Sequence, residues 1–369
     1  MYRYGRKPIR AFLPRVPLKS AARGIGMRMS DKKEKEEHRT GTQGKRTMSH
    51  PFLTALGFGV AGAGGALLGA ANYFYECAMK PMPHDPSHDS DPGERPYRAG
   101  RDWMNSHVLR RDVWITSHDG LRLHGNLIPS GDPACHRYAI CVHGWHDSAE
   151  SMGLYARHYY EDHGMTVLLP DLRGFGKSEG NCAGMGYEDA RDLIRWIRRI
   201  TETDAEAVIL LHGISMGAAA VLQTTGNRLP HAVRAAVADS SYTSAVEEFR
   251  AVYQKMPGSF VPSDVMIQAV RAVALVRAGY DIDKASPLSA VTHSTTPTLF
   301  IQGDSDDFVP PSMMPRLFEA ASCPKECAWF AGAGHVASVV TDPQGYWKQV
   351  DHFLDRVYPF LLHQNIRPE

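Results

Sequence analysis

The chain has 369 residues, of which 43% are hydrophobic and 22% charged, a composition that predicts a globular core and excludes a wholly disordered chain. The formal net charge is +1, but the charges are unevenly distributed. Residues 1–50 carry 14 Lys and Arg against 4 Asp and Glu, a net charge of +10, so residues 51–369 have a net charge of −9. The acidic balance of residues 51–369 excludes a basic nucleic-acid-binding surface there, and we expect no nucleic-acid partner.

The sequence of the first 76 residues is typical of a disordered tail followed by a membrane-spanning segment. Residues 1–50 are basic and lack apolar periodicity, so we expect a disordered tail. Residues 52–75 include no charged side chain, and a helix of this length can cross a hydrocarbon core of about 30 Å. We therefore predict a transmembrane signal anchor over residues 51–76, with the following domain extracytoplasmic at the cell membrane. A cleaved signal peptide, giving a secreted protein, is an alternative, as are a buried Gly/Ala-rich helix and a mitochondrial presequence.

The rest of the chain is expected to form a linker and one domain. Residues 77–99 contain a run rich in Pro, Asp and His, which is typical of a solvated spacer. Residues 100–365 then show apolar runs that alternate with helical periodicity, and we assign them to one catalytic domain.

The alternating pattern predicts a mostly parallel eight-stranded sheet with helices on both faces and an antiparallel hairpin at one edge. Such sheets carry their reactive groups just beyond the carboxyl ends of the strands. Helices are predicted at residues 148–163, 188–200 and 216–225, and strands at residues 113–116, 121–128, 138–142, 166–169, 207–211, 235–238, 298–301 and 327–330.

Residues 244–296 separate two predicted strands and have a length typical of a small helical cap. Within them, residues 265–278 are helical in pattern and apolar over much of their surface. This helix either lines a pocket for an apolar group or packs on the body as an ordinary lid.

The pattern G-x-S-x-G occurs twice, centred on Ser215 and on Ser178. A nucleophile elbow needs a strand directly before the serine and a helix directly after it. Ser215 follows the apolar strand at residues 207–211 and precedes the helix at residues 216–225, whereas loop-forming sequence flanks Ser178 on both sides. We therefore predict Ser215 as a nucleophile and reject Ser178.

A serine nucleophile needs a histidine base and an orienting carboxylate. In a strand–elbow–helix topology the chain order is serine, acid, histidine. The loop after residues 298–301 offers Asp304, Asp306 and Asp307, and His335 follows among small residues. His143 precedes both the serine and the acids, so this order argues against it as the base.

The oxyanion formed by attack needs backbone N–H donors. We expect one from Met216, directly after the nucleophile, and the other from Trp145, in the loop after the third strand. The six cysteines lack paired C-x-x-C spacing, and neither a metal nor an organic cofactor is expected.

These segments resemble the α/β-hydrolase family over about residues 100–360, and within it the bacterial membrane-anchored serine hydrolases of the BEM46 type. The resemblance implies the α/β-hydrolase fold and selects Asp306 as the acid, beside Ser215 and His335. The segments that carry it are residues 143–145, 171–180, 213–217, 239–244, 303–310 and 334–335.

The combined prediction is a serine hydrolase that cleaves a carboxylic ester or related acyl bond through a Ser–His–Asp triad. We expect a small-molecule acyl or ester substrate, with lipid-like molecules among the options, and contact with a membrane through the N-terminal helix. The alternatives are a serine peptidase or acyltransferase on the same triad, and a binding protein of the same fold without activity.

Overall fold

The computed structural model describes residues 51–81, 95–106, 108–256 and 259–362. The chain divides into two compact units, Met1–Ala70 and Ala71–Glu369. The predicted tail over residues 1–50 and most of the predicted linker lie outside the described residues.

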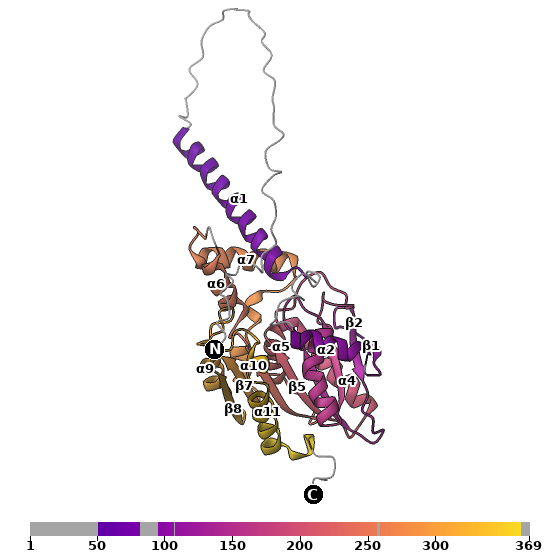
Figure 1. The fold of residues 1–369 in the computed structure, drawn as a ribbon. Helices are drawn as coiled ribbons and strands as arrows, with labels where there is room; N and C mark the ends of the chain where they lie inside the picture. Colours follow the sequence, from indigo (N-terminus) through magenta and orange to yellow (C-terminus); the bar gives the residue numbers. More distant parts are fainter. Residues whose placement is uncertain (1–50, 82–94, 107, 257–258, 363–369) are drawn as a thin grey trace, which may run out of the picture. The chain divides into compact units, whose positions relative to one another are not determined.

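Unit Ala71–Glu369 is built on an eight-stranded sheet with strand order β1-β2-β4-β3-β5-β6-β7-β8 (Figure 1). Strands β1 and β2 form an antiparallel hairpin, β2 pairs antiparallel with β4, and all other neighbours are parallel. The predicted mostly parallel sheet with an antiparallel edge is thus confirmed. The strands are β1 (Arg111–Thr116), β2 (Arg122–Ile128), β3 (Arg137–Val142), β4 (Thr166–Pro170), β5 (Val208–Ile214), β6 (Val233–Asp239), β7 (Thr298–Gly303) and β8 (Lys325–Phe330).

Burial along the strands follows their place in the sheet. Every residue of β4, β5 and β7 is buried, whereas the edge strand β1 has only exposed and partly buried residues and β8 mixes exposed, partly buried and buried ones. Central parallel strands are covered on both faces, which is why they are apolar throughout. In the register of β3, β5 and β6, Val142 pairs with Gly213, and Gly213 pairs with Ala238. The carboxyl ends of these three strands therefore lie level at one edge.

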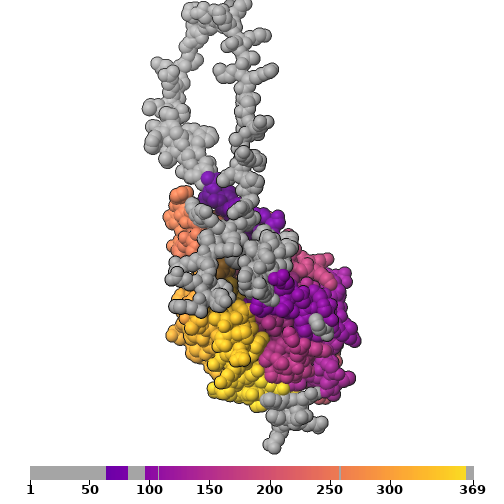
Figure 2. Space-filling view, viewed as in Figure 1, coloured from indigo at the N-terminus to yellow at the C-terminus, as the bar shows by residue number. Residues whose placement is uncertain are grey.

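Helices cover both faces of the sheet. On one face α2, α3 and α11 share a core with the strands, while α5, α8 and α9 pack on the other. Figure 2 shows the yellow C-terminal segment at the surface beside purple and magenta segments from the first half of the chain. These helices are α2 (Arg95–Ser106), α3 (Gly153–Arg157), α4 (Tyr187–Thr203), α5 (Met216–Thr225), α8 (Pro287–Val291), α9 (Met313–Ala320), α10 (Ser338–Thr341) and α11 (Pro343–Val357).

The predicted helix over residues 148–163 is wound in three ways. A 3₁₀ turn, η4 (Ala149–Met152), leads into α3, and a π-helical turn, η5 (His158–Asp162), follows α3. Apolar periodicity alone does not distinguish these windings, because each exposes a similar fraction of apolar positions to the core.

The cap between β6 and β7 consists of α6 (Ala245–Lys255), α7 (Ser263–Arg277), η6 (Ile282–Lys284) and α8. The predicted cap helix corresponds to α7. Its buried face is Met266, Ile267, Val270 and Ala274, while Leu275 and Val276 are exposed.

Helix α1 (Pro51–Met79) covers the segment predicted as a membrane anchor. Its last turns belong to unit Ala71–Glu369, where Phe74 is buried and meets Phe249 and Tyr253 of α6 edge to face. The helix continues to Met79, beyond the predicted start of the linker at residue 77, and its last residues are held by the body: Cys77 and Met79 are buried, and the carbonyl of Met79 accepts the N–H of Ala183.

Within the described residues, no helix combines the length and the hydropathy of a membrane span.

Candidate active site

Ser215 stands at the turn between β5 and α5. Its φ is +52° and its ψ is −121°, a backbone conformation that costs energy for a residue with a side chain and recurs at nucleophile elbows. The flanking glycines make the turn possible, because a Cβ at Gly217 would overlap the carbonyl oxygen of Val142, and one at Gly213 would overlap Gly217. The strand–turn–helix context predicted for Ser215 is present in the structure.

Ser215, His335 and Asp306 form a hydrogen-bonded chain. His335 Nε2 lies 2.8 Å from Ser215 Oγ, and His335 Nδ1 lies 2.8 Å from Asp306 Oδ2. Both contacts have the length expected of a nucleophile–base–acid set. The structure therefore brings together the three side chains that the sequence selected, from the loops after β5, β7 and β8.

The three candidate acids differ in their surroundings. Asp306 is buried, its Oδ1 accepts the backbone N–H of Phe308 and of Val309, and its Oδ2 accepts from Gln302 Nε2. These donors fix the carboxylate and leave Oδ2 aimed at His335. Asp304 is exposed and accepts the N–H of Gly332 instead, and the exposed Asp307 contributes only its carbonyl, to Lys255.

The environment of His335 sets its protonation. Burial is the largest influence and lowers the pKa of His335, but the charge and hydrogen bond of Asp306, aided by Glu248 and Asp239, outweigh it and hold this pKa above 6.5. A base with a raised pKa accepts a proton from a hydroxyl more readily, provided that the pH keeps it neutral.

Met216 and the loop that carries Trp145, the two expected sources of oxyanion donors, adjoin Ser215 through Met216 itself and through Gly144. Met216 is the first residue of α5, where a backbone N–H has no acceptor within the helix. A Cβ at Gly144 would meet Ser215 Cβ at 3.3 Å, so the loop that carries Trp145 passes directly against the nucleophile. The Trp145 indole donates to the carbonyl of Ala78 (2.9 Å) and stacks on His146. This loop is therefore tied to the end of α1.

Both ring nitrogens of His143 hydrogen-bond to backbone groups, and its ring meets Phe175 edge to face. Its Nδ1 lies 2.7 Å from the carbonyl oxygen of Gly144, and its Nε2 accepts the N–H of Leu172 at 3.0 Å. With both ring nitrogens engaged, His143 joins the loops after β3 and β4, in agreement with its rejection as the base.

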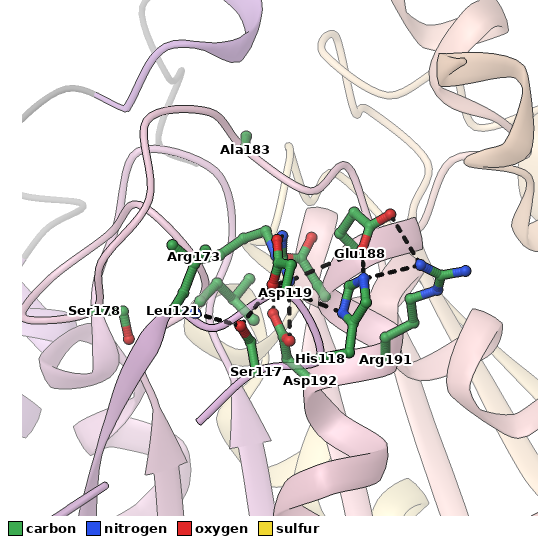
Figure 3. A network of polar contacts seen from close by, with 12 residues as sticks. Ser117, His118, Asp119, Leu121, Arg173, Ser178, Ala183, Glu188, Arg191 and Asp192 are labelled. Atoms are coloured by element: carbon green, nitrogen blue, oxygen red, sulfur yellow. Dashed lines mark hydrogen bonds and ion pairs between the residues drawn. The ribbon is translucent and has the colours of Figure 1, made fainter. Parts of the chain in front are cut away.

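Ser178 lies in a loop fixed by polar contacts (Figure 3). Its Oγ donates to the carbonyl of Asp171 at 2.7 Å and accepts the N–H of His124 at 2.9 Å. The same loop includes the buried Arg173, which Figure 3 shows between Asp119 and Asp192; its guanidinium binds both carboxylates. Backbone groups thus serve as both the acceptor and the donor for the hydroxyl of Ser178.

Two further side chains hold the loop that carries His335, and the sequence assigned a role to neither. Ser240 Oγ accepts the N–H of Val336 (3.3 Å) and donates to Asp239 Oδ1 (2.9 Å), while Tyr97 of α2 donates to the carbonyl of Val336 (2.7 Å). Val336 has a φ of +55° and needs such support. Ser240 lies within the segment 239–244 that carried the family resemblance, but nothing in the sequence marks Tyr97.

The cap contributes the buried Glu248, only 3% exposed, and neither of its carboxylate oxygens has a hydrogen-bond partner among the described residues. Burial raises the pKa of Glu248 to about 8, with the charge of His335 as the largest opposing influence. Burial therefore favours the protonated form of Glu248, which lies within electrostatic range of the base.

Comparison with known proteins supports the architecture. The profile of the Alpha/beta hydrolase family matches residues 139–349. The uncharacterized protein YqkD of Bacillus subtilis (strain 168) is 28% identical over 201 residues, or 54% of this chain and 65% of YqkD. The uncharacterized protein YfhR of Escherichia coli (strain K12) is 27% identical over 254 residues, or 68% of this chain and 80% of YfhR.

Among solved structures, the Pyrococcus furiosus esterase Pf2001 gives a TM-score of 0.55 at 20% identity, over 76% of this chain and 97% of Pf2001. A likeness at this identity reflects a shared fold. The profile match covers more than half of the sequence and includes the strand–elbow–helix unit. The chain therefore belongs to the alpha/beta hydrolase family.

Proposed function

We propose that the protein is a serine hydrolase that cleaves a carboxylic ester or related acyl bond through an acyl-enzyme. The observation that carries this proposal is the continuous contact from Ser215 Oγ to His335 Nε2 and from His335 Nδ1 to Asp306, each 2.8 Å long. Binding alone gives no reason to hold a strained serine against a histidine whose other ring nitrogen meets a buried carboxylate.

In the proposed reaction Ser215 Oγ attacks the acyl carbon while its proton passes to His335 Nε2. The backbone N–H groups of Met216 and Trp145 stabilise the oxyanion, each by about 3 kcal/mol. His335 then donates the proton to the leaving alcohol, and the acyl group stays on Ser215. A water molecule, deprotonated by His335, attacks the acyl-enzyme and releases the carboxylic acid. Asp306 holds the imidazole and stabilises its protonated form.

Two considerations favour an ester over an amide substrate. The structural relative Pf2001 is described as an esterase, and an alcohol leaves more readily than an amine from the tetrahedral intermediate. Amide hydrolysis and acyl transfer use the same groups, so the preference is a matter of leaving group and acceptor.

A fluorophosphonate probe, which reacts with activated serines, tests the proposal. We expect the full chain to be labelled, Ser215→Ala to lose labelling, and Ser178→Ala, which removes the serine of the other G-x-S-x-G segment, to keep it. Circular dichroism confirms that each variant is folded. Labelling that survived in Ser215→Ala would refute the assignment. Matched p-nitrophenyl ester and p-nitroanilide substrates then separate esterase from amidase activity.

A further inference from the structure

Two histidines and an aspartate meet at a point remote in sequence from the proposed triad. His158 and His163 flank the π-helical turn η5, and Asp351 lies on α11. His158 Nε2 is 2.9 Å from Asp351 Oδ1, His163 Nε2 is 3.2 Å from the same oxygen, and the two Nε2 atoms are 3.1 Å apart. Three metal-ligating atoms thus form a nearly equilateral triangle.

The triangle has the dimensions of one face of a tetrahedral metal site. Zinc binds histidine nitrogen and carboxylate oxygen at about 2.0–2.2 Å, which separates neighbouring ligand atoms of a tetrahedron by roughly 3.3–3.6 Å, slightly more than the distances between these three atoms. The observed edges of 2.9, 3.1 and 3.2 Å are close to this range. An ion could therefore bind with small shifts of the ring and carboxylate positions.

The hydrogen bonding of His158 favours a cation at the centre. Its Nδ1 lies 2.8 Å from Asp162 Oδ2, and a carboxylate on the far nitrogen is the outer-shell partner that metal-binding histidines commonly have. With its proton on Nδ1, the bare Nε2 of His158 faces the carboxylate of Asp351 and the ring nitrogen of His163. Lone pairs that face one another at such distances need a shared proton or a cation between them.

The backbone holds these side chains in place before any ion binds. In an α-helix, residues five apart point about 140° away from each other, whereas the i→i+5 hydrogen bonding of a π-helix places them nearly one above the other. The π turn thus brings His158 and His163 to one side. The Trp347 ring stacks on His158 at 3.8 Å, and the buried Arg137 donates to the carbonyl of His163 at 2.8 Å.

We propose that His158, His163 and Asp351 bind one divalent transition-metal ion, of which Zn²⁺ fits best, with a water molecule as the fourth ligand. Imidazole nitrogens suit zinc and its neighbours in the first transition row, while Mg²⁺ and Ca²⁺ prefer all-oxygen sites. The ion joins η5, before the central strand β4, to the C-terminal helix α11. The bound ion would stabilise the packing of α11 against η5, because it ligates side chains of both.

Titration of the full-length, metal-stripped protein with Zn²⁺ tests the proposal. We expect one equivalent at this site, a rise in melting temperature on addition of the ion, and no comparable response to Mg²⁺. His163→Ala and Asp351→Asn should each weaken this binding at least tenfold. Co²⁺ at the site should give the visible absorption of a tetrahedral complex, absent in His163→Ala.

His136→Ala is the matched control, because His136 also pairs with a carboxylate, Asp204, at 2.8 Å but has no second histidine beside it. Zinc binding should be unchanged in this variant. His163→Gln, which keeps a hydrogen-bonding side chain, repeats the measurement if the Ala variant proves unfolded without metal. The proposal is overturned if the wild-type protein does not bind Zn²⁺, or if affinity and stoichiometry are the same in His163→Ala, Asp351→Asn and wild type.

Discussion

Ser215 and Ser178 occupy the centre of the same five-residue pattern, and their hydroxyls meet different partners. Ser215 Oγ faces a histidine ring nitrogen, which can take its proton. Ser178 Oγ donates to one backbone carbonyl and accepts one backbone N–H, neither of which can act as a base. The glycines of the two patterns also lie against different groups. A Cβ at Gly176 would overlap the carboxylate of Asp171, whereas a Cβ at Gly213 or Gly217 would overlap backbone atoms. The elements around the pattern, a strand before and a helix after, decide which serine is poised to react.

The largest expected effect separates the two serines directly. Ser215→Ala should lower kcat/KM for a p-nitrophenyl ester by about 10⁵–10⁶-fold, since removal of a nucleophile leaves only oxyanion stabilisation and substrate positioning. Steady-state kinetics on purified protein measures this loss. A decrease of less than tenfold would mean that another group attacks the substrate.

The acid should be the next most sensitive position. Asp306→Asn removes the charge that stabilises protonated His335 and favours the wrong tautomer, and we expect kcat to fall by roughly 10⁴-fold. Asp304→Asn is the matched control from the same loop, and its kcat should stay within about threefold of wild type because its carboxylate contacts only Gly332 and Ser305. Equal losses in the two variants would contradict the choice of Asp306.

The pH dependence of kcat/KM reports the state of His335. The base must be neutral, so the rate should fall about tenfold per pH unit below the pKa of His335 in the free enzyme. Because Asp306 holds this pKa above 6.5 against the effect of burial, the midpoint of the acid limb should lie above pH 6.5. In Asp306→Asn the largest influence that raises this pKa is lost while burial remains, so the midpoint should move to lower pH. A midpoint that is the same in both proteins would show that another group titrates.

A smaller effect is expected from Tyr97, which supports the proposed site from α2. Tyr97→Phe removes the hydroxyl that donates to the carbonyl of Val336, and Val336 then loses one of the side chains that hold its backbone. We expect kcat to fall by about three- to tenfold with little change in KM, since the base is displaced and the binding surface is not. An unchanged kcat would show that the loop that carries His335 stays in place without this hydroxyl.

Features that depend on neighbouring residues could be predicted from the sequence, whereas contacts between residues far apart in the chain could not. The strands at 207–211 and 298–301 were predicted because a central parallel strand is apolar throughout; β5 starts one residue later than predicted, and β7 contains the second segment. Ser215 and His335 were identified through the elbow pattern and a fixed chain order, whereas Asp306 was selected among three aspartates by the family resemblance. The support of Val336 by Tyr97 joins residues 239 apart, and the contact of His158 with Asp351 joins residues 193 apart. No local pattern marks such pairs, which exist only once the sheet has brought its flanking helices together.

The smallest effect on activity, and the sharpest test of the comparison, is expected for Ser178→Ala. The substitution leaves the carbonyl of Asp171 and the N–H of His124 without the hydroxyl that now serves both. Unsatisfied partly buried backbone groups cost about 1–3 kcal/mol, so the free energy of unfolding measured by urea denaturation should fall by that amount. Meanwhile kcat/KM should stay within about twofold, because the loop does not contact Ser215 or His335. Ser305→Ala, an exposed serine bonded only to the adjacent Asp304, should change neither quantity. A folded Ser178→Ala protein without activity would mean that the second pattern takes part in the chemistry, and that the surrounding strand and helix do not suffice to identify the nucleophile.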